Sequence, residues 1–170
     1  HRQAPHAVHE IRRAADALAL GWRADEAVIT EPTDLAIGVG HKGFSCAEVI
    51  VHGRAAHGSR PKEGKDAIMA MGRVLQRLEQ LDAALHSRPP HPLVGVASLH
   101  AGRIQGGTEL SVYPARAVLE MERRTLPGEQ VDVAVSELQQ IATDIATSDP
   151  DFRADVRLLL ARPAYETPPD

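Results

Sequence analysis

The chain contains 170 residues, of which 43% are hydrophobic, 25% charged and only 3% aromatic, a composition typical of a folded domain with an aliphatic core. Its net charge of −4, from 19 basic and 23 acidic residues, provides no electrostatic basis for binding nucleic acid or an anionic membrane. A single cysteine, Cys46, excludes an internal disulfide and a cysteine-rich zinc site, and no apolar run reaches the roughly 18 residues of a membrane span, so we expect a cytoplasmic protein.

The first forty residues contain a helical pattern followed by two short strand patterns. Apolar residues at three- and four-residue spacing predict a helix over residues 7–20. Residues 27–30 predict a buried strand, and Glu31 follows at its carboxyl end. Open α/β sheets place ligand-binding groups at that edge, although a solvated loop carboxylate explains Glu31 equally well. A further strand is predicted over residues 35–40, and we place a domain boundary after it.

A short loop with His57 at its centre follows the strand predicted over residues 44–52. The neighbours of His57 are small, because Ala55, Ala56 and Gly58 surround it, so the imidazole should be exposed. Such an imidazole can donate a hydrogen bond or bind a metal near neutral pH. On spacing alone, an ordinary surface histidine is the favoured interpretation.

Two amphipathic helices and three further strands complete the pattern. Apolar stripes at helical spacing predict the helices, and alternating apolar residues predict the strands. Residues 101–108 contain three glycines, including Gly106 and Gly107, and are expected to form a bend. The proline-rich tail, residues 162–170, shows no periodicity. The helices are predicted over residues 65–86 and 129–147, and the strands over residues 93–100, 116–125 and 155–161.

This order of elements predicts an α+β fold, a ferredoxin-like β-α-β-β-α-β sandwich in which two helices cover one face of a four-stranded antiparallel sheet. Alternation along residues 116–125 directs Ala117, Leu119 and Met121 towards the helices. The other face of the sheet is left open, and Glu48 is one of the residues expected on it. An exposed sheet edge or helix that pairs with its own copy would give a two-fold dimer.

Five motifs occur in order along the chain: Glu31-Pro32-Thr33, His41-Lys42-Gly43, Ala56-His57-Gly58-Ser59-x-Pro61, Gly106-Gly107 and the segment from Glu122 to Glu129. Together they resemble the dinuclear-zinc aminoacylase family, which includes acetylornithine deacetylase, succinyl-diaminopimelate desuccinylase and the glutamate carboxypeptidases. The resemblance covers about residues 27–165 and implies three parts. Residues 1–40 would be a fragment of the α/β catalytic domain, residues 41–162 the lid and dimerisation domain, and residues 163–170 a linker back to the catalytic domain.

The resemblance also implies roles for single residues. Glu31 matches a zinc ligand, and His57 matches a histidine that enters the partner subunit's active site and stabilises an oxyanion. Arg124 matches the arginine that holds the substrate's free carboxylate, a task that suits its planar guanidinium. An ion pair between Arg124 and its neighbour Glu122 is the alternative interpretation.

A glycine loop would complete the substrate contacts. Gly106 and Gly107 match the loop that precedes a substrate-contacting asparagine in the family. In this chain Ser111 occupies the position of that asparagine, and a shorter hydroxyl side chain changes both reach and hydrogen bonding. The substrate of the intact enzyme therefore stays open within the class of N-acyl amino acids and small peptides.

Most of the zinc-binding apparatus of the family has no counterpart in this chain, which contains neither an HxD motif nor a Glu-Glu pair. One carboxylate cannot hold two zinc ions, so we expect the chain alone to bind no zinc and to be inactive. The intact enzyme would hold two zinc ions and act as a homodimer. The alternative is a stand-alone ferredoxin-like interaction module without catalysis. RNA binding on the open sheet is disfavoured, because the chain has only one Trp, two Tyr and two Phe.

Overall fold

A computed structural model describes residue 16, residues 19–23 and residues 38–168 of the chain. The chain divides into two compact units, residues 1–38 and residues 39–170, and the fold described below is that of the second. Glu31 and the strand predicted over residues 27–30 lie outside the described residues, as do most of the predicted helix over residues 7–20 and of the strand over residues 35–40.

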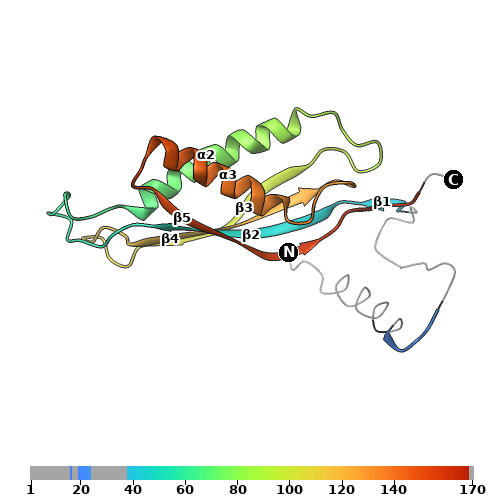
Figure 1. The fold of residues 1–170 in the computed structure, drawn as a ribbon, viewed down its shortest axis with the longest axis horizontal. Helices are drawn as coiled ribbons and strands as arrows, with labels where there is room; N and C mark the ends of the chain where they lie inside the picture. The colour runs from blue at the N-terminus through green and yellow to red at the C-terminus, as the bar shows by residue number, and fades with distance from the viewer. Residues whose placement is uncertain (1–15, 17–18, 24–37, 169–170) are drawn as a thin grey trace. The chain divides into compact units, whose positions relative to one another are not determined.

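Four long strands form an antiparallel sheet in the order β3-β4-β2-β5 (Figure 1). In this order β4 lies between β2 and β3, which run parallel to each other and are joined by a helix. This is the arrangement of a ferredoxin-like sandwich, so the predicted α+β fold is confirmed. The strands are β2 (Gly43–His52), β3 (Ser98–Gly106), β4 (Arg116–Thr125) and β5 (Arg153–Arg162).

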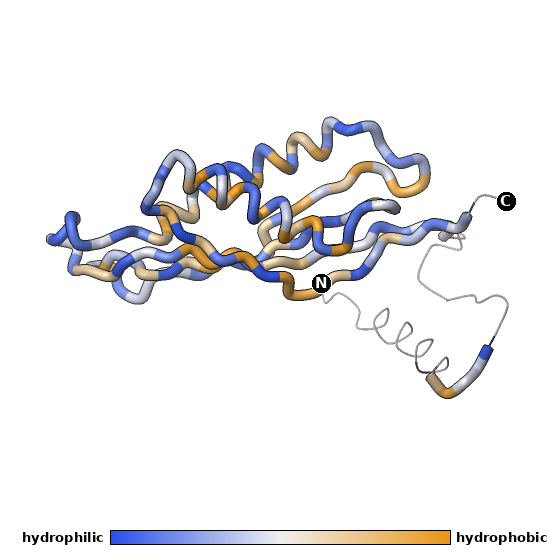
Figure 2. The backbone as a smooth tube through the Cα atoms, in the orientation of Figure 1, coloured by the Kyte–Doolittle hydropathy of each residue, from blue (hydrophilic) through white to orange (hydrophobic). Residues whose placement is uncertain are grey.

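Two helices, α2 (Ala67–His86) and α3 (Val133–Ser148), cover the same face of the sheet (Figure 1). The helix α2 begins where the side chain of Asp66 accepts a hydrogen bond of 2.9 Å from the backbone N–H of Met69. Hydrophobic and hydrophilic residues alternate along the strands in Figure 2, as expected for a sheet with one covered face. The fully buried core residues of the strands and helices include Ala47, Val49, Val51, Leu119, Met71, Val74 and Leu138.

The strand β3 differs from the prediction at both ends. It begins at Ser98 and continues to Gly106, so most of the predicted bend over residues 101–108 is strand. Pairing with β4 keeps Gly102 and Gly106 in the strand, and the register shifts between Ala101 and Arg103. Gly106 also allows α2 to approach, because a Cβ at this position would lie 2.9 Å from the Cγ1 atom of Ile68. The bend predicted from the glycines is therefore wrong over residues 101–106.

A short two-stranded sheet joins the two ends of the described unit. Strand β1 (Gly40–His41) pairs antiparallel with β6 (Tyr165–Glu166), so part of the proline-rich tail forms a strand although its sequence shows no periodicity. The backbone N–H of Thr167 extends this ladder with a hydrogen bond of 2.8 Å to the carbonyl of Val39. The segments that enter and leave the sandwich consequently lie side by side. None of the helices within the described residues has the length and apolar character needed to cross a bilayer.

Candidate functional site

The loop that contains His57 is held by a second loop at one end of the sheet. Residues 56–58 and residues 111–113 face each other as a short antiparallel pair, with an isolated bridge between His57 and Val112. Within this pair the backbone N–H of Gly58 donates to the carbonyl of Ser111 at 2.7 Å. A Cβ at Gly58 would lie 3.2 Å from the same oxygen, so glycine permits the close approach. We call residues 55–60 and 107–113 the tip.

The imidazole of His57 is exposed and its Nδ1 atom faces the neighbouring serine. Nδ1 lies 2.8 Å from the Ser59 Oγ atom and 3.2 Å from the Ser59 backbone nitrogen. Nε2 has no hydrogen-bond partner among the described residues of the chain. A ring held through one nitrogen and exposed at the other can present Nε2 to a molecule outside the loop.

The two glycines predicted to contact substrate also lie next to the tip. Gly106 ends β3, and Gly107 adopts a φ of 76°, in the left-handed region that favours glycine. Both line an open pocket of about 410 Å³. Val112 and Tyr113 of the second tip loop line the same pocket. The structure therefore groups His57, Ser111, Gly106 and Gly107 at one end of the sheet.

Arg124 lies at the opposite end of the sheet. Its Cα partner in β2 is Phe44, near the beginning of that strand, and its guanidinium carbon lies 5.9 Å from the centre of the Phe44 ring. Its Nη1 atom forms an ion pair of 3.3 Å with Glu122, so the alternative interaction is present in the structure. With 39% of the Arg124 side chain exposed, this pair is screened by water and leaves the guanidinium accessible to a second carboxylate.

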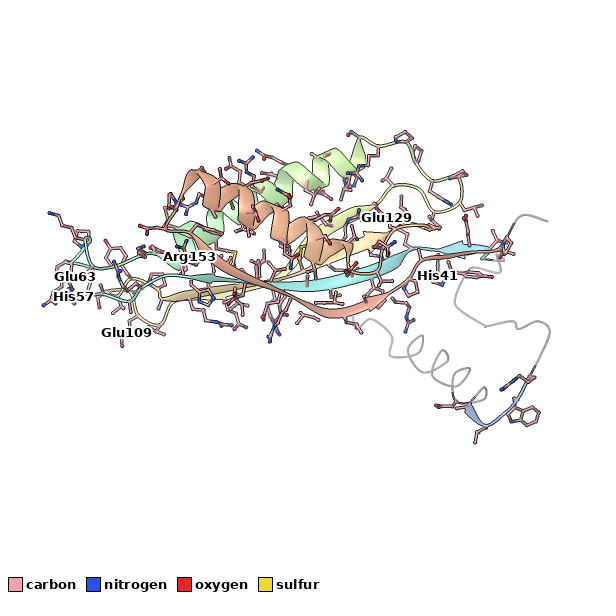
Figure 3. All side chains as sticks on the ribbon, viewed as in Figure 1. His41, His57, Glu63, Glu109, Glu129 and Arg153 are labelled. Atoms are coloured by element: carbon pink, nitrogen blue, oxygen red, sulfur yellow. The ribbon has the colours of Figure 1, made fainter. Side chains whose placement is uncertain are left out.

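The length of β2 separates the two predicted groups of site residues. Its ten residues, at about 3.3 Å each, span roughly 30 Å between the Phe44 end and the His52 end. In Figure 3, His57, Glu63 and Glu109 are at one end of the unit, and His41 and Glu129 are at the other. His57 and Arg124 of one subunit therefore cannot contact the same small molecule.

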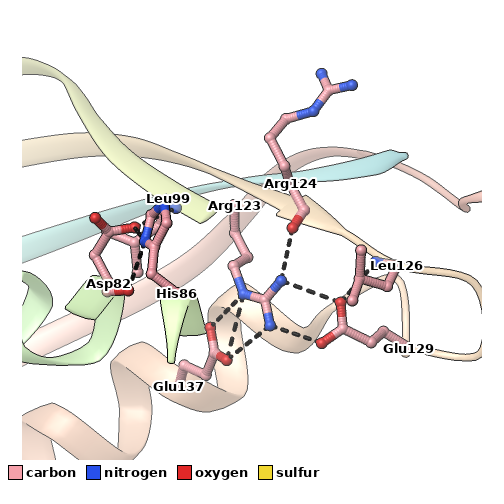
Figure 4. A network of polar contacts seen from close by, with 8 residues as sticks. All are labelled: Asp82, His86, Leu99, Arg123, Arg124, Leu126, Glu129 and Glu137. Atoms are coloured by element: carbon pink, nitrogen blue, oxygen red, sulfur yellow. Dashed lines mark hydrogen bonds and ion pairs between the residues drawn. The ribbon is translucent and has the colours of Figure 1, made fainter. Parts of the chain in front are cut away.

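A buried polar cluster around Arg123 was missed by the sequence analysis. The side chain of Arg123 is fully buried and forms ion pairs with Glu129 at 2.7 Å and with Glu137 at 3.2 Å. It also donates a hydrogen bond of 2.7 Å to the backbone carbonyl of Arg124. Figure 4 shows the Arg123 and Arg124 guanidinium groups on opposite sides of β4. The alternation along β4 places Arg123 on the helix-facing side in the sequence pattern. That position could have indicated a buried arginine, which needs acidic partners.

The cluster includes the turn that precedes α3. Burial alone would raise the pKa of Glu129, but hydrogen bonds from Arg123 and from the backbone N–H of Leu126 outweigh it and hold that pKa below its usual range. Glu129 lies in the turn before α3, and the helix begins at Val133 and not near residue 129 as predicted. The cluster therefore joins the end of β4, the following turn and α3.

The open face of the sheet presents a row of opposite charges. Glu48 lies there as expected, but only 5% of it is exposed, and it pairs with Arg157 at 2.6 Å. Glu120 lies opposite Glu48 in the neighbouring strand and pairs with Arg103 at 2.5 Å. Each carboxylate thus forms an ion pair with its own arginine, and the two ion pairs together extend across all four strands.

The residues required for a two-metal centre are not grouped in the described part of the chain. Within residue 16, residues 19–23 and residues 38–168, no set of three or more His, Cys, Asp or Glu side chains could hold a metal ion. Glu31, the predicted zinc ligand, lies outside the described residues. The described residues consequently do not fit a dinuclear zinc site.

Comparison with known proteins identifies the described unit. Residues 39–150 match the family model of the M20 peptidase dimerisation domain. An acetylornithine deacetylase from Myxococcus xanthus is 34% identical over 144 residues, which are 81% of this chain and 37% of that protein. A probable carboxypeptidase from Aspergillus flavus is 32% identical over 131 residues, 75% of this chain and 30% of that protein. This chain thus spans about a third of the length of these relatives.

Solved structures of other proteins contain the same fold. The aminobenzoyl-glutamate utilization protein from Klebsiella pneumoniae superposes with a TM-score of 0.56 at 25% identity, over 76% of this chain and 30% of that one. A hydantoinase/carbamoylase family amidase from Burkholderia ambifaria gives a TM-score of 0.62 at 18% identity, over 75% and 30% of the two chains. At the lower identity, the second likeness shows the fold alone.

Proposed function

Because the chain belongs to the M20 peptidase dimerisation domain family, we propose that it is the lid and dimerisation domain of an enzyme that cleaves the amide bond of an N-acyl amino acid or a small peptide. M20 proteins are in general metal-dependent hydrolases, and the relatives named above include a deacetylase and a carboxypeptidase. Zinc as the metal, this substrate class and a cytoplasmic location are parts of the proposal.

The observation that supports this function best is the separation of His57 from Arg124. Two side chains at opposite ends of a ten-residue strand can serve one small substrate only if they come from different subunits. In a two-fold dimer, the tip of one copy can meet the Arg124 end of the other, and the symmetry then creates two equivalent sites. The family to which the chain belongs is itself defined by dimerisation.

The edge of the sheet formed by β3 is the surface that we propose for this dimer. It is one of the two outer strands, and among the described residues no further strand pairs with it, so its backbone groups are free to do so. Ile104 on β3 and Ile68 on α2 are 52% and 45% exposed and line the same apolar hollow of about 220 Å³. Two apolar residues beside an unpaired strand favour contact with a second copy.

In the assembled site the residues of this chain would bind and orient the substrate. The Nε2 atom of His57 would donate a hydrogen bond to the negative charge that develops on the carbonyl oxygen during hydrolysis. Arg124 would hold the free carboxylate of the substrate through two parallel hydrogen bonds. Gly106, Gly107 and Ser111 would border the substrate beside His57. Metal ligands would have to come from outside the described residues, and Glu31 is the one proposed from this chain.

A subunit-mixing experiment on the intact enzyme tests the proposal. His57→Ala and Arg124→Ala homodimers should both be inactive. After the two variants are unfolded, mixed and refolded together, half of the dimers are mixed, and each has one site with both residues intact. About a quarter of wild-type activity should therefore return. If the two residues act within one subunit, no activity returns.

A stand-alone interaction module without catalysis is the second candidate. The lack of a metal-binding cluster among the described residues favours it for this chain. It predicts a dimer of the 18.3 kDa chain with no hydrolase partner and no effect of His57 or Arg124 on any reaction. The solution mass, measured with the hydrolysis of N-acyl amino acids by the longer protein, distinguishes the two.

A further inference from the structure

The contacts of Ser59 with His57 determine which ring nitrogen bears the proton. The Ser59 backbone nitrogen lies 3.2 Å from His57 Nδ1, and a backbone N–H can only donate. In this arrangement Nδ1 accepts, with its lone pair directed at Ser59. The hydroxyl of Ser59, 2.8 Å from the same atom, adds a second donor to this side of the ring. In the neutral imidazole the proton is then on Nε2.

The loop backbone keeps Ser59 in this position. The N–H of Arg60 donates to the carbonyl of His57 at 2.8 Å and closes a tight turn around residues 57–60. The hydrogen bond from Gly58 to Ser111 fixes the same turn to the opposite loop at 2.7 Å. Ser59 is thus held beside the ring by main-chain contacts that do not involve the imidazole.

We propose that Ser59 is a positioning residue that selects the Nε2–H tautomer of His57 and directs that N–H away from the loop. This inference rests on the proposed role of His57 as a hydrogen-bond donor. With the proton on Nε2, the ring offers a donor to a developing oxyanion. With the other tautomer, the ring would offer a lone pair at Nε2, which repels negative charge. The residue beside Nδ1 therefore sets the chemistry available at Nε2, as partners of metal-bound histidines do.

The tautomer can be measured directly on the 170-residue chain. Histidine labelled with nitrogen-15 is observed by long-range proton–nitrogen NMR at a pH where the ring is neutral. The signals of His57 are identified among those of the nine histidines by their loss in His57→Gln. We expect an unprotonated Nδ1 and a protonated Nε2 in the wild type. A solvated histidine also favours this tautomer, so the variants of Ser59 decide the question.

Two substitutions change the partner of Nδ1 in opposite ways. Ser59→Asp replaces the hydroxyl with a carboxylate, which can only accept. The backbone N–H of residue 59 is retained, but its contact of 3.2 Å is long, and a charge-assisted hydrogen bond to the carboxylate should outweigh it and move the proton to Nδ1. Ser59→Thr retains the hydroxyl and should retain the wild-type tautomer. Unchanged backbone amide spectra outside the tip would show that both variants fold normally. The inference is wrong if Ser59→Asp leaves the proton on Nε2, or if the wild type already has it on Nδ1.

Kinetics of the intact enzyme separate this inference from the function beneath it. Ser59→Asp should lower kcat by about 10²-fold, as the loss of an oxyanion donor does, with little change in KM. Ser59→Thr, which retains the hydroxyl, should keep most of the wild-type kcat. If the tautomer changes in the NMR spectra but kcat does not, Ser59 still controls the ring, and the proposed donor role of His57 is wrong.

Discussion

Arg123 illustrates how one buried side chain can organise the region around a candidate binding residue. Its guanidinium is fully buried and is shared by Glu129, Glu137 and the backbone carbonyl of Arg124. A buried arginine is tolerated only when its donors are satisfied, and here acidic groups from the turn and from α3 satisfy them. The end of β4, where Arg124 leaves the sheet, is thereby fixed from the helix side.

Replacement of Arg123 should therefore destabilise the fold strongly. Arg123→Met retains much of the apolar volume but leaves the carboxylates of Glu129 and Glu137 together without a cation. We expect the free energy of unfolding to fall by about 3 kcal/mol, measured by urea denaturation at neutral pH. Arg124→Met is the matched control, because its ion pair is exposed and should contribute less than about 1 kcal/mol. Equal effects of the two substitutions would contradict this account.

The lowered pKa of Glu129 predicts how stability depends on pH. A carboxyl whose pKa is lower in the folded state stabilises the fold above its unfolded pKa, and this contribution is lost as the pH falls through the folded pKa. We expect wild-type stability to begin falling near pH 4.5, the ordinary pKa of a glutamate side chain, and to continue falling below it. Glu129→Gln should be less stable at neutral pH and should show a flatter profile in that acidic range. Parallel profiles of the two proteins would show that Glu129 does not titrate in this way.

At this scale the sequence identified the residue types but not their partners. The alternation along β4 correctly assigned Ala117, Leu119 and Met121 to the buried face. The same alternation includes Arg123, but its partners are six and fourteen residues further along the chain and are joined to it only by the fold. A local pattern could indicate that Arg123 needs anions, and only the packing of α3 on β4 shows which ones.

The strands and helices show a similar division between local and non-local signals. The bounds of β4 and the end of α2 were predicted to the residue, because apolar alternation and a helical stripe are properties of the segment itself. The strand β3 was displaced in the prediction, because its glycine-rich sequence becomes a strand only through pairing with β4. The pair β1–β6 was missed for the same reason, since two residues on each side form no pattern.

The two outer strands of the sheet provide a matched test of the proposed dimer surface. Ile104 on β3 is 52% exposed and Leu159 on β5 is 44% exposed, so neither is needed for the core. Ile104→Asp should convert a dimer into an 18.3 kDa monomer in light scattering, because it introduces a charge into the proposed interface. Leu159→Asp should leave the dimer intact.

The fold of both variants should be unchanged in circular dichroism, since each substituted side chain is already partly in water. The opposite result, a monomer only with Leu159→Asp, would move the interface to the β5 edge. A dimer in both variants would exclude both edges as the main contact.

For the molecule as a whole, the ferredoxin-like unit contains its own core. All residues of the buried hydrophobic cluster lie between Ala47 and Phe152. The two strands β1 and β6 are the places where the chain enters and leaves this unit, and they are paired with each other. The fold class followed from the order of the elements. The candidate site residues could be proposed one at a time from the sequence, but their arrangement could not, because His57 and Arg124 lie at opposite ends of one subunit.

The position of the domain boundary can be tested by two truncations that differ by two residues. A fragment of residues 39–168 retains both strands of the β1–β6 ladder and the complete core, so we expect it to unfold cooperatively with a free energy within about 0.5 kcal/mol of the full chain. A fragment that begins at residue 41, the start predicted from the turn, lacks Gly40 and its pairing with Glu166. Hydrogen exchange should then be faster at Thr167, whose N–H donates to Val39 in the longer fragment, while the four-stranded sheet stays protected. Loss of cooperative unfolding in the 39–168 fragment would instead mean that the preceding residues belong to the same folding unit.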